Sequence, residues 1–166
     1  MASTEAIHEG VARVSAALRA AGHAIEPVML SDAARTAQQA ADALGVALGQ
    51  IAKSIIFRRL PDDTAVLVIT SGDRRVDEAK VQALVCAADQ SLGRADAQFV
   101  KSKTGFAIGG VAPVAHTSAP ACLIDRDLLR FEQVWAAAGH PHAVFALSPQ
   151  DLAKLAGAPA HDVALV

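Results

Sequence analysis

The sequence predicts a mixed α/β domain in which helices pack around a mixed sheet. Segments with the periodicity of amphipathic helices alternate along the chain with short segments rich in Ile and Val, an order typical of α/β folds. Two of these apolar segments, 51–59 and 65–70, are separated by Pro61-Asp62-Asp63, which predicts a hairpin. The 166 residues suffice for one core, so we expect a single domain over residues 1–166.

The helices are predicted from apolar spacing and from capping residues. Thr36 and Gln39, for example, form a capping-box pattern, and Gly45 follows as a C-cap. The predicted helices begin at Ser3 or Thr4 and end near Ala20, span 37–44, 77–87, 96–103 and 128–138, and open again at Pro149. The predicted strands are 23–30, 51–59, 65–70, 106–115, 121–124 and 142–147.

The run from Thr104 to Ile124 carries no Asp, Glu, Lys or Arg over 21 residues. That length is close to the roughly 20 apolar residues that cross a bilayer. Its glycines and prolines, however, would break a lone helix and leave backbone groups unsatisfied in lipid. We therefore expect a strand-like segment, a glycine loop and a second strand here, with no membrane partner.

Composition narrows the classes of function. A net charge of −2 and 4% aromatic residues exclude a broadly basic nucleic-acid surface with many stacking rings, and DNA is not an expected partner. A local basic rim remains compatible with phosphate contacts, and a solvated face explains the same charges equally well. The rim would draw on Arg58, Arg59, Arg74, Arg75, Lys80, Arg94, Lys101 and Lys103.

The two cysteines, Cys86 and Cys122, provide neither a disulfide framework nor a metal-binding spacing. The first nine residues lack the basic and apolar regions of a signal peptide. A reducing cytoplasm is therefore the expected compartment.

Lys53 stands inside a strongly apolar predicted strand, where alternation places it on one face with Ile51 and Ile55. A lysine in this setting has two interpretations. It lies at a sheet edge, where it discourages aggregation, or it points into a cleft and meets an anion or a ligand oxygen.

The segment Gly109-Gly110 with Pro113 predicts a tight, constrained loop. Its backbone N–H groups could hold an ester carbonyl or the oxyanion that develops from it. The spacing is not that of a Walker A or dinucleotide motif, and an ordinary turn is the alternative. Because no Gly-x-Ser-x-Gly elbow is present, a hydrolase here would use water as its nucleophile.

His140 and His142 stand two residues apart before a predicted strand. A metal site would need a third ligand, and none has a matching spacing, so no metal is expected. His142 alone could orient a substrate or a water molecule. A structural histidine at the start of a strand is an equally good interpretation.

In combination, these segments resemble the YbaK-like proteins, also called the prolyl-tRNA synthetase-associated editing domain family. The resemblance extends from about Thr36 to Val163. It is carried by the strand 51–57 with Lys53, the strand and turn 66–75, the segment 104–113 with its Gly-x-x-x-Pro loop, and the helix 149–157.

The resemblance implies a single α/β domain with a mixed, partly barrel-like sheet surrounded by helices. It also implies hydrolysis of the ester bond of mischarged aminoacyl-tRNA, in trans or as an inserted synthetase domain, without metal or organic cofactor. Lys53 matches the lysine that activity requires, and Gly109 and Pro113 match the ends of the loop that holds the aminoacyl-adenosine. Val144 falls near the Asp of the cysteine-specific branch, which speaks against Cys-tRNA as substrate.

The leading hypothesis is therefore a trans-editing aminoacyl-tRNA deacylase that removes a small noncognate amino acid, from tRNA-Pro or a related tRNA. Lys53, Gly109 and Gly110 are the predicted catalytic residues. The predicted substrate contacts are Ile108, Val111, Ala112, Pro113 and His142, and the predicted tRNA contacts are Arg74, Arg75 and Lys101. The expected partners are aminoacyl-tRNA and a synthetase. A binding module without catalysis and a hydrolase of another small ester are the alternatives.

Overall fold

The computed structural model describes residues 4–31, 34 and 36–165. In this part of the chain the helices are α1 (Thr4–Ala20), α2 (Ala37–Leu44), α3 (Glu78–Val85), α4 (Ala97–Thr104) and α5 (Pro149–Ala156), with 3-10 turns η1 (Leu48–Gln50) and η2 (Arg126–Arg130). The strands are β1 (Val28–Met29), β2 (Ile51–Leu60), β3 (Thr64–Ser71), β4 (Ser91–Arg94), β5 (Ala121–Asp125), β6 (Val134–His140), β7 (Ala143–Leu147) and β8 (Ala160–His161). The predicted mixed α/β fold is confirmed.

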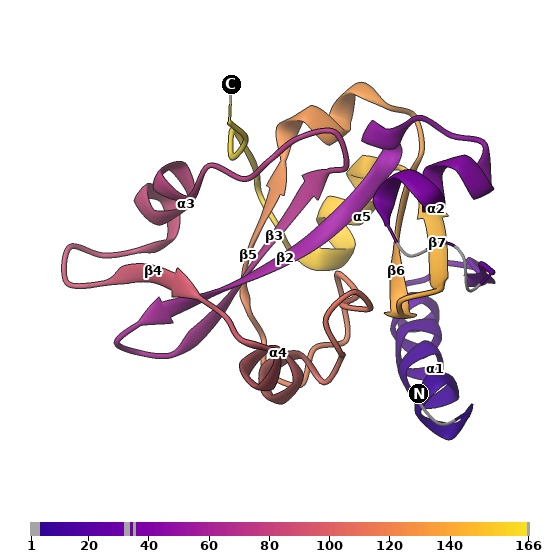
Figure 1. Ribbon diagram of the computed structural model, residues 1–166, viewed down its shortest axis with the longest axis horizontal. Coiled ribbons are helices and arrows are strands. Elements are labelled where there is room, and N and C mark those ends of the chain that lie inside the picture. The colour runs from indigo at the N-terminus through magenta and orange to yellow at the C-terminus, as the bar shows by residue number, and fades with distance from the viewer. Residues whose placement is uncertain (1–3, 32–33, 35, 166) are drawn as a thin grey trace.

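One strand, β2, organises the sheet. The strand order is β1-β7-β6-β2-β3-β5-β8, and β4 pairs with β2 in addition. One edge of β2 pairs with β3 from Ala52 to Arg59. Its other edge pairs with β6 only at residues 51 and 52, in parallel, and with β4 at residues 57–60. Figure 1 shows β2 and β3 crossing the molecule, with β4 toward one end and β6 and β7 toward the other.

The two faces of this sheet bury separate cores. Ala52 and Ile56 point to the larger core, which also contains side chains of α1, α5 and the segment after α4. Ile55 and Phe57 point to the smaller core, which is covered by Val81 of α3. The alternation of β2 therefore assigns Lys53 to the face of the smaller core and Ser54 to the face of the larger one.

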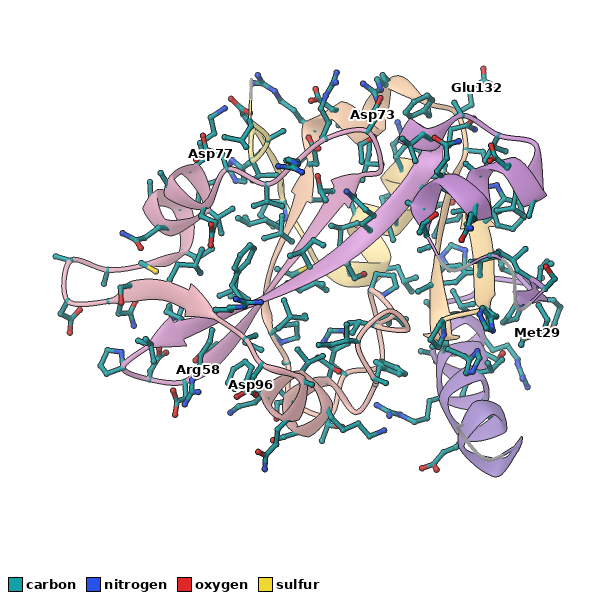
Figure 2. The ribbon with its side chains drawn as sticks, in the orientation of Figure 1. Met29, Arg58, Asp73, Asp77, Asp96 and Glu132 are labelled. Carbon is teal, nitrogen blue, oxygen red and sulfur yellow. The ribbon has the colours of Figure 1, made fainter. Side chains whose placement is uncertain are left out.

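Several predicted elements are confirmed at close to their expected bounds. The capping box at α2 forms, with the Thr36 hydroxyl accepting from the Gln39 N–H at 3.1 Å. The hairpin of β2 and β3, the helix α4 and the last helix α5 also occur as predicted. Asp77 and Asp96 cap the starts of α3 and α4 (Figure 2). Ser3, one of two predicted caps of α1, lies outside the described residues.

The predicted helix over 128–138 is wrong. The segment instead forms the end of η2 and then β6. Val134, Ala136 and Ala138 are buried while the residues between them are half-buried, which is the period-two pattern of a strand. Pairing with β2 on one side and β7 on the other outweighs the helix propensity of the alanines.

The predicted strand over 106–115 is also wrong. The chain there forms an irregular segment in which Gly109 has φ of +90° and Ala115 has φ of +66°. It still packs into the larger core through Phe106, Val111 and Ala112, which explains why the segment carries no charge. The predicted strand over 23–30 shortens to the two residues of β1, and β4 was not predicted at all.

Arg13 of α1 fixes this irregular segment to the rest of the molecule. Its guanidinium donates to the carbonyl oxygens of Thr104 and Gly105, both at 3.3 Å, and to that of Ala115. The same group lies over the Phe106 ring, 4.6 Å from its centroid. A single side chain thus ties both ends of the segment to α1.

Helix α1 lies on β6 through a contact between two glycines. A Cβ on Gly10 would overlap the carbonyl oxygen of Gly139, and a Cβ on Gly139 would overlap that of Gly10. Gly139 also has φ of +93°, a conformation that glycine adopts readily. Only glycine at both positions allows this close approach.

We expect Gly10→Ala to destabilise the protein, although alanine is the better helix former by about 1 kcal/mol. Overlap with Gly139 should outweigh propensity and lower the free energy of unfolding by about 1 to 3 kcal/mol, as overpacking does. Urea denaturation measures this. Ala16, exposed on α1, is the control, because Ala16→Gly should cost only the propensity difference. A more stable Gly10→Ala protein would contradict the glycine contact.

His116 predicts a dependence of stability on pH. Its Nε2 lies 2.6 Å from the Ala112 carbonyl oxygen, its buried Nδ1 has no hydrogen-bond partner among the described residues, and burial lowers its pKa below the ordinary 6.5. The unfolded chain therefore binds this proton more readily, so stability should fall as pH drops below about 6.5. Thermal unfolding between pH 7.5 and 5 measures the effect. His116→Asn should flatten the curve, and an equally steep curve in that variant would assign it to other groups.

Candidate functional site

A cavity of about 350 Å³ lies where β6 separates from β2. Its walls come from five places: the open edge of β2, the middle of β6, the first turns of α2, the loop after α4 and the turn between β6 and β7. They comprise Ala34, Thr36, Ala37, Ala40, Ile51, Ala52, Lys53, Ser54, Ile55, Ile108, Gly109, Val111, Trp135, Ala136, Ala137, Pro141 and Val144. The lining is mainly apolar and built from small side chains.

The cavity exists because two neighbouring strands pair over a very short distance. β2 and β6 are in register only at Ile51 with Trp135 and at Ala52 with Ala136. Beyond that point β6 follows β7, with an irregularity between Ala137 and His140. In the described structure, residues 53–56 of β2 have no strand on this edge, and residues 53–55 line the cavity.

Lys53 lies in this wall with its ammonium turned toward the loop after β3. Its Nζ donates to the carbonyl oxygen of Arg74 at 3.1 Å. Burial lowers the pKa of Lys53, the charge of Arg75 lowers it further, and Asp73 acts in the opposite direction. Among the described residues Lys53 forms no ion pair. Both interpretations of the sequence fit this position, because in the described structure Lys53 lies on the stretch of β2 edge without a strand partner and also lines the cavity.

A polar cluster holds the loop that faces Lys53. Asp73 accepts two hydrogen bonds from Arg130, both at 2.7 Å, and Arg130 also donates to the Ser71 hydroxyl at 3.1 Å. Ser71 in turn donates to the carbonyl oxygen of Gly49 at 2.6 Å. Figure 2 shows Asp73 on the turn that follows β3. The cluster fixes the backbone that supplies the carbonyl partner of Lys53. No local pattern in the sequence predicts that Arg130 joins it.

The glycine loop contributes to the cavity in two ways. Gly109 and Val111 line it, and Ile108 stands at its rim with 60% of its surface exposed. Gly110 is buried against the next turn, where a Cβ would come within 2.9 Å of backbone carbon of His140 and of Pro141 Cδ. Glycine at this position lets the loop approach the turn between β6 and β7.

The other predicted site residues lie outside this cavity. Ala112 and Pro113 are buried behind the loop and support it. Arg74 pairs with Asp127 at 3.2 Å, and its backbone rather than its side chain faces Lys53. His142 and Lys101 line a second, neighbouring cavity.

Two polar side chains of the cavity wall were not predicted. In the part of the chain that the structure describes, Ser54 Oγ and Trp135 Nε1 are buried without a hydrogen-bond partner, although both residues line the cavity. Leaving such groups unsatisfied costs free energy, so they are natural points for a ligand to engage after a small adjustment. Ser54 follows Lys53 on the open edge, which is a signal the sequence did offer. Trp135 was not predicted as a site residue because the segment 128–138 was predicted as a helix.

The described residues bring together no group of three or more His, Cys, Asp or Glu side chains that could hold a metal ion. Nor does any helix in this part of the chain have the length and apolar character needed to span a membrane.

Comparison with known proteins places this fold and cavity in a family. The family model for the aminoacyl-tRNA editing domain matches residues 31–155. The chain belongs to the aminoacyl-tRNA editing domain family, as its resemblance to the YbaK-like proteins predicted.

Individual relatives agree with this assignment. The chain is 33% identical to the uncharacterised protein YwhH of Bacillus subtilis, over 72% of this chain and 73% of that protein. It is 35% identical over 80 residues to the proline–tRNA ligase of Thermosipho africanus, which is 48% of this chain but 14% of the ligase. A solved structure described as a proposed trans-editing enzyme for prolyl-tRNA synthetase is 37% identical, with a TM-score of 0.88 and 100% of both chains covered.

The charges around Lys53 predict opposite effects of two substitutions. Asp73→Asn removes a carboxylate that raises the pKa of Lys53, so that pKa should fall further. Arg75→Gln removes a cation that lowers it, so the pKa should rise. NMR titration of ¹³C-labelled lysine Cε atoms in the two variants measures both shifts. Shifts in the same direction, or none, would contradict this account of the site.

Proposed function

We propose that the protein hydrolyses the ester bond between a small noncognate amino acid and the 3′-terminal adenosine of a tRNA, acting in trans. The observation that supports this best is the combination of a small-walled apolar cavity with one partly buried ammonium at its edge, in a chain of the editing family. The similarity to proline–tRNA ligases favours tRNA-Pro as the acceptor. Such a substrate would be met in the cytoplasm, with prolyl-tRNA synthetase as a partner.

The walls favour a small aminoacyl group. Ala37, Ala40, Ala52, Ala136 and Ala137 leave room for a short side chain and offer no charge to a larger polar one. A pocket of this kind distinguishes neighbouring aliphatic residues by about 10 to 200-fold per methylene. That is adequate for editing, because the site has only to exclude the larger cognate amino acid by steric overlap.

Lys53 is the residue we assign to stabilising the transition state. One of its three N–H donors is directed at the Arg74 carbonyl, which leaves two for a substrate oxygen. Placed beside the ester, they would stabilise the negative charge that develops on the carbonyl oxygen. The backbone N–H of Gly109 would bind the same oxygen or the ribose hydroxyls, whereas the Gly110 N–H already donates to the Ala107 carbonyl oxygen at 3.0 Å.

Water is the proposed nucleophile. Neither cysteine lines the cavity, and burial raises the pKa of the Cys122 thiol to about 12, so it stays protonated. Water adds to the ester carbon and the bond from that carbon to the ribose oxygen breaks. The proton lost by water goes to the departing ribose oxygen, relayed by the substrate's own amino group or vicinal hydroxyl, and the free amino acid leaves.

Lys53→Met should lower kcat/KM for deacylation by about 100 to 1,000-fold, the usual cost of one lost oxyanion donor. The assay uses alanyl-, cysteinyl-, seryl- and threonyl-tRNA prepared on tRNA-Pro. Lys154 is exposed on α5 and does not line the cavity, so Lys154→Met is the matched control and should retain full activity. Wild-type rates in Lys53→Met would remove Lys53 from the mechanism. Failure of the folded wild-type protein to hydrolyse any of these substrates would refute the function.

A further inference from the structure

A second cavity, of about 340 Å³, lies directly beside the first. Pro141 lines both, and successive residues of one loop divide them, since Ala107 lines the second and Ile108 and Gly109 line the first. The second cavity is bounded by α1, the end of α4 and the turn between β6 and β7. Figure 1 shows α1 running alongside the end of β6 and β7 where this turn lies.

This cavity is basic, in contrast to the net acidity of the chain. Arg13, Lys101, His140 and His142 line it from three separate elements, and among the side chains that the structure describes Glu9 is the one acidic residue of the lining. Within the described residues, neither Arg13 nor Lys101 forms an ion pair. Both instead donate to the Gly105 carbonyl oxygen, at 3.3 Å and 3.2 Å. Their charges are therefore held in place without being neutralised by a carboxylate.

The donors are also oriented by the surrounding structure. Arg13 is fixed by its bonds to the loop backbone and by the Phe106 ring, so little side-chain entropy remains to be lost on binding. His140 Nδ1 accepts the backbone N–H of His142 at 3.1 Å, which orients the ring in the wall. Fixed cationic donors at one wall are a favourable arrangement for a phosphate group.

We propose that this second cavity binds the phosphodiester group that precedes the nucleoside held in the first cavity. The inference rests on the proposed function, because that function places the 3′ end of a nucleotide chain in the first cavity. The phosphate of the preceding nucleotide must then pass the shared wall at Pro141 and Gly109. The basic cavity stands on the other side of that wall, where it would receive the anion.

Binding of small ligands tests this without requiring catalysis. The dinucleotide CpA carries one phosphodiester, and adenosine carries none. We expect wild-type protein to bind CpA about tenfold more tightly than adenosine, because one charge-assisted phosphate contact is added. The advantage should shrink as salt is raised. Isothermal titration calorimetry at two salt concentrations gives both quantities.

The variant Lys101→Gln/His142→Gln should lose the advantage of CpA and leave adenosine binding unchanged, since neither residue lines the first cavity. Arg13 is left intact because it holds the loop. Lys103→Gln is the matched control, on the same helix and with the same change of charge but outside the cavity, and it should bind CpA as the wild type does.

Several outcomes would overturn the proposal. Equal affinity of the wild type for CpA and adenosine, or no measurable CpA binding, contradicts it. Inorganic phosphate is the second comparison. If its binding free energy equals the gain of CpA over adenosine and depends on Lys101 in the same way, the cavity is a site for free anions instead.

Kinetics separate this proposal from the proposed function. If wild-type protein deacylates aminoacyl-tRNA and the double variant shows the same KM and salt dependence, the second cavity has no role and the function stands. If no aminoacyl-tRNA is hydrolysed but the double variant still loses the CpA advantage, the cavity proposal stands and the function fails.

Discussion

The incomplete pairing of one edge of β2 is the constraint on which the rest of the structure depends. β3 occupies the other edge almost throughout, whereas this edge meets β6 for two residues and β4 for four. The gap between them exposes backbone in the middle of a sheet, where unpaired groups are costly unless something engages them. The loop after α4 approaches the gap, and the space that remains is the first cavity.

Holding that gap open requires support from both sides. Arg13 ties the loop to α1, and the contact between Gly10 and Gly139 ties α1 to β6. On the opposite side, Arg130 and Asp73 fix the turn whose carbonyl receives Lys53. The wall of the cavity is thus rigid where it meets the sheet, and a preformed site of this kind loses less entropy when a ligand binds.

Local chemistry made much of this architecture predictable from the sequence. The capping box at Thr36, the Asp caps and the Pro-Asp-Asp turn are short-range signals, and each marked an element that the structure contains. Lys53 could be singled out because an ammonium in an apolar strand demands an explanation. The predicted helix over 128–138 and the predicted strand over 106–115 were wrong because contacts with residues distant in the sequence determine the structure there. Ala136 to Ala138 form a strand because β2 and β7 pair with it. The segment 106–115 is irregular, and Arg13 of α1 binds backbone carbonyls at its two ends. No local pattern records those partners.

Long-range contacts also explain why the predicted site residues line two different cavities. Gly109, Ile108 and Val111 were recognised through a local motif and do line the first cavity with Lys53. Lys101 was predicted as a tRNA contact from its charge, and His142 as a substrate contact at the start of a strand. The turn at Pro141 brings them together beside Arg13, a residue on α1 that no motif in the sequence singles out. Because Gly110 sets how closely that turn meets the loop, one small residue determines the wall between both cavities. The apolar cavity and the basic one are therefore two sides of a single contact, and a change at that contact should affect both together.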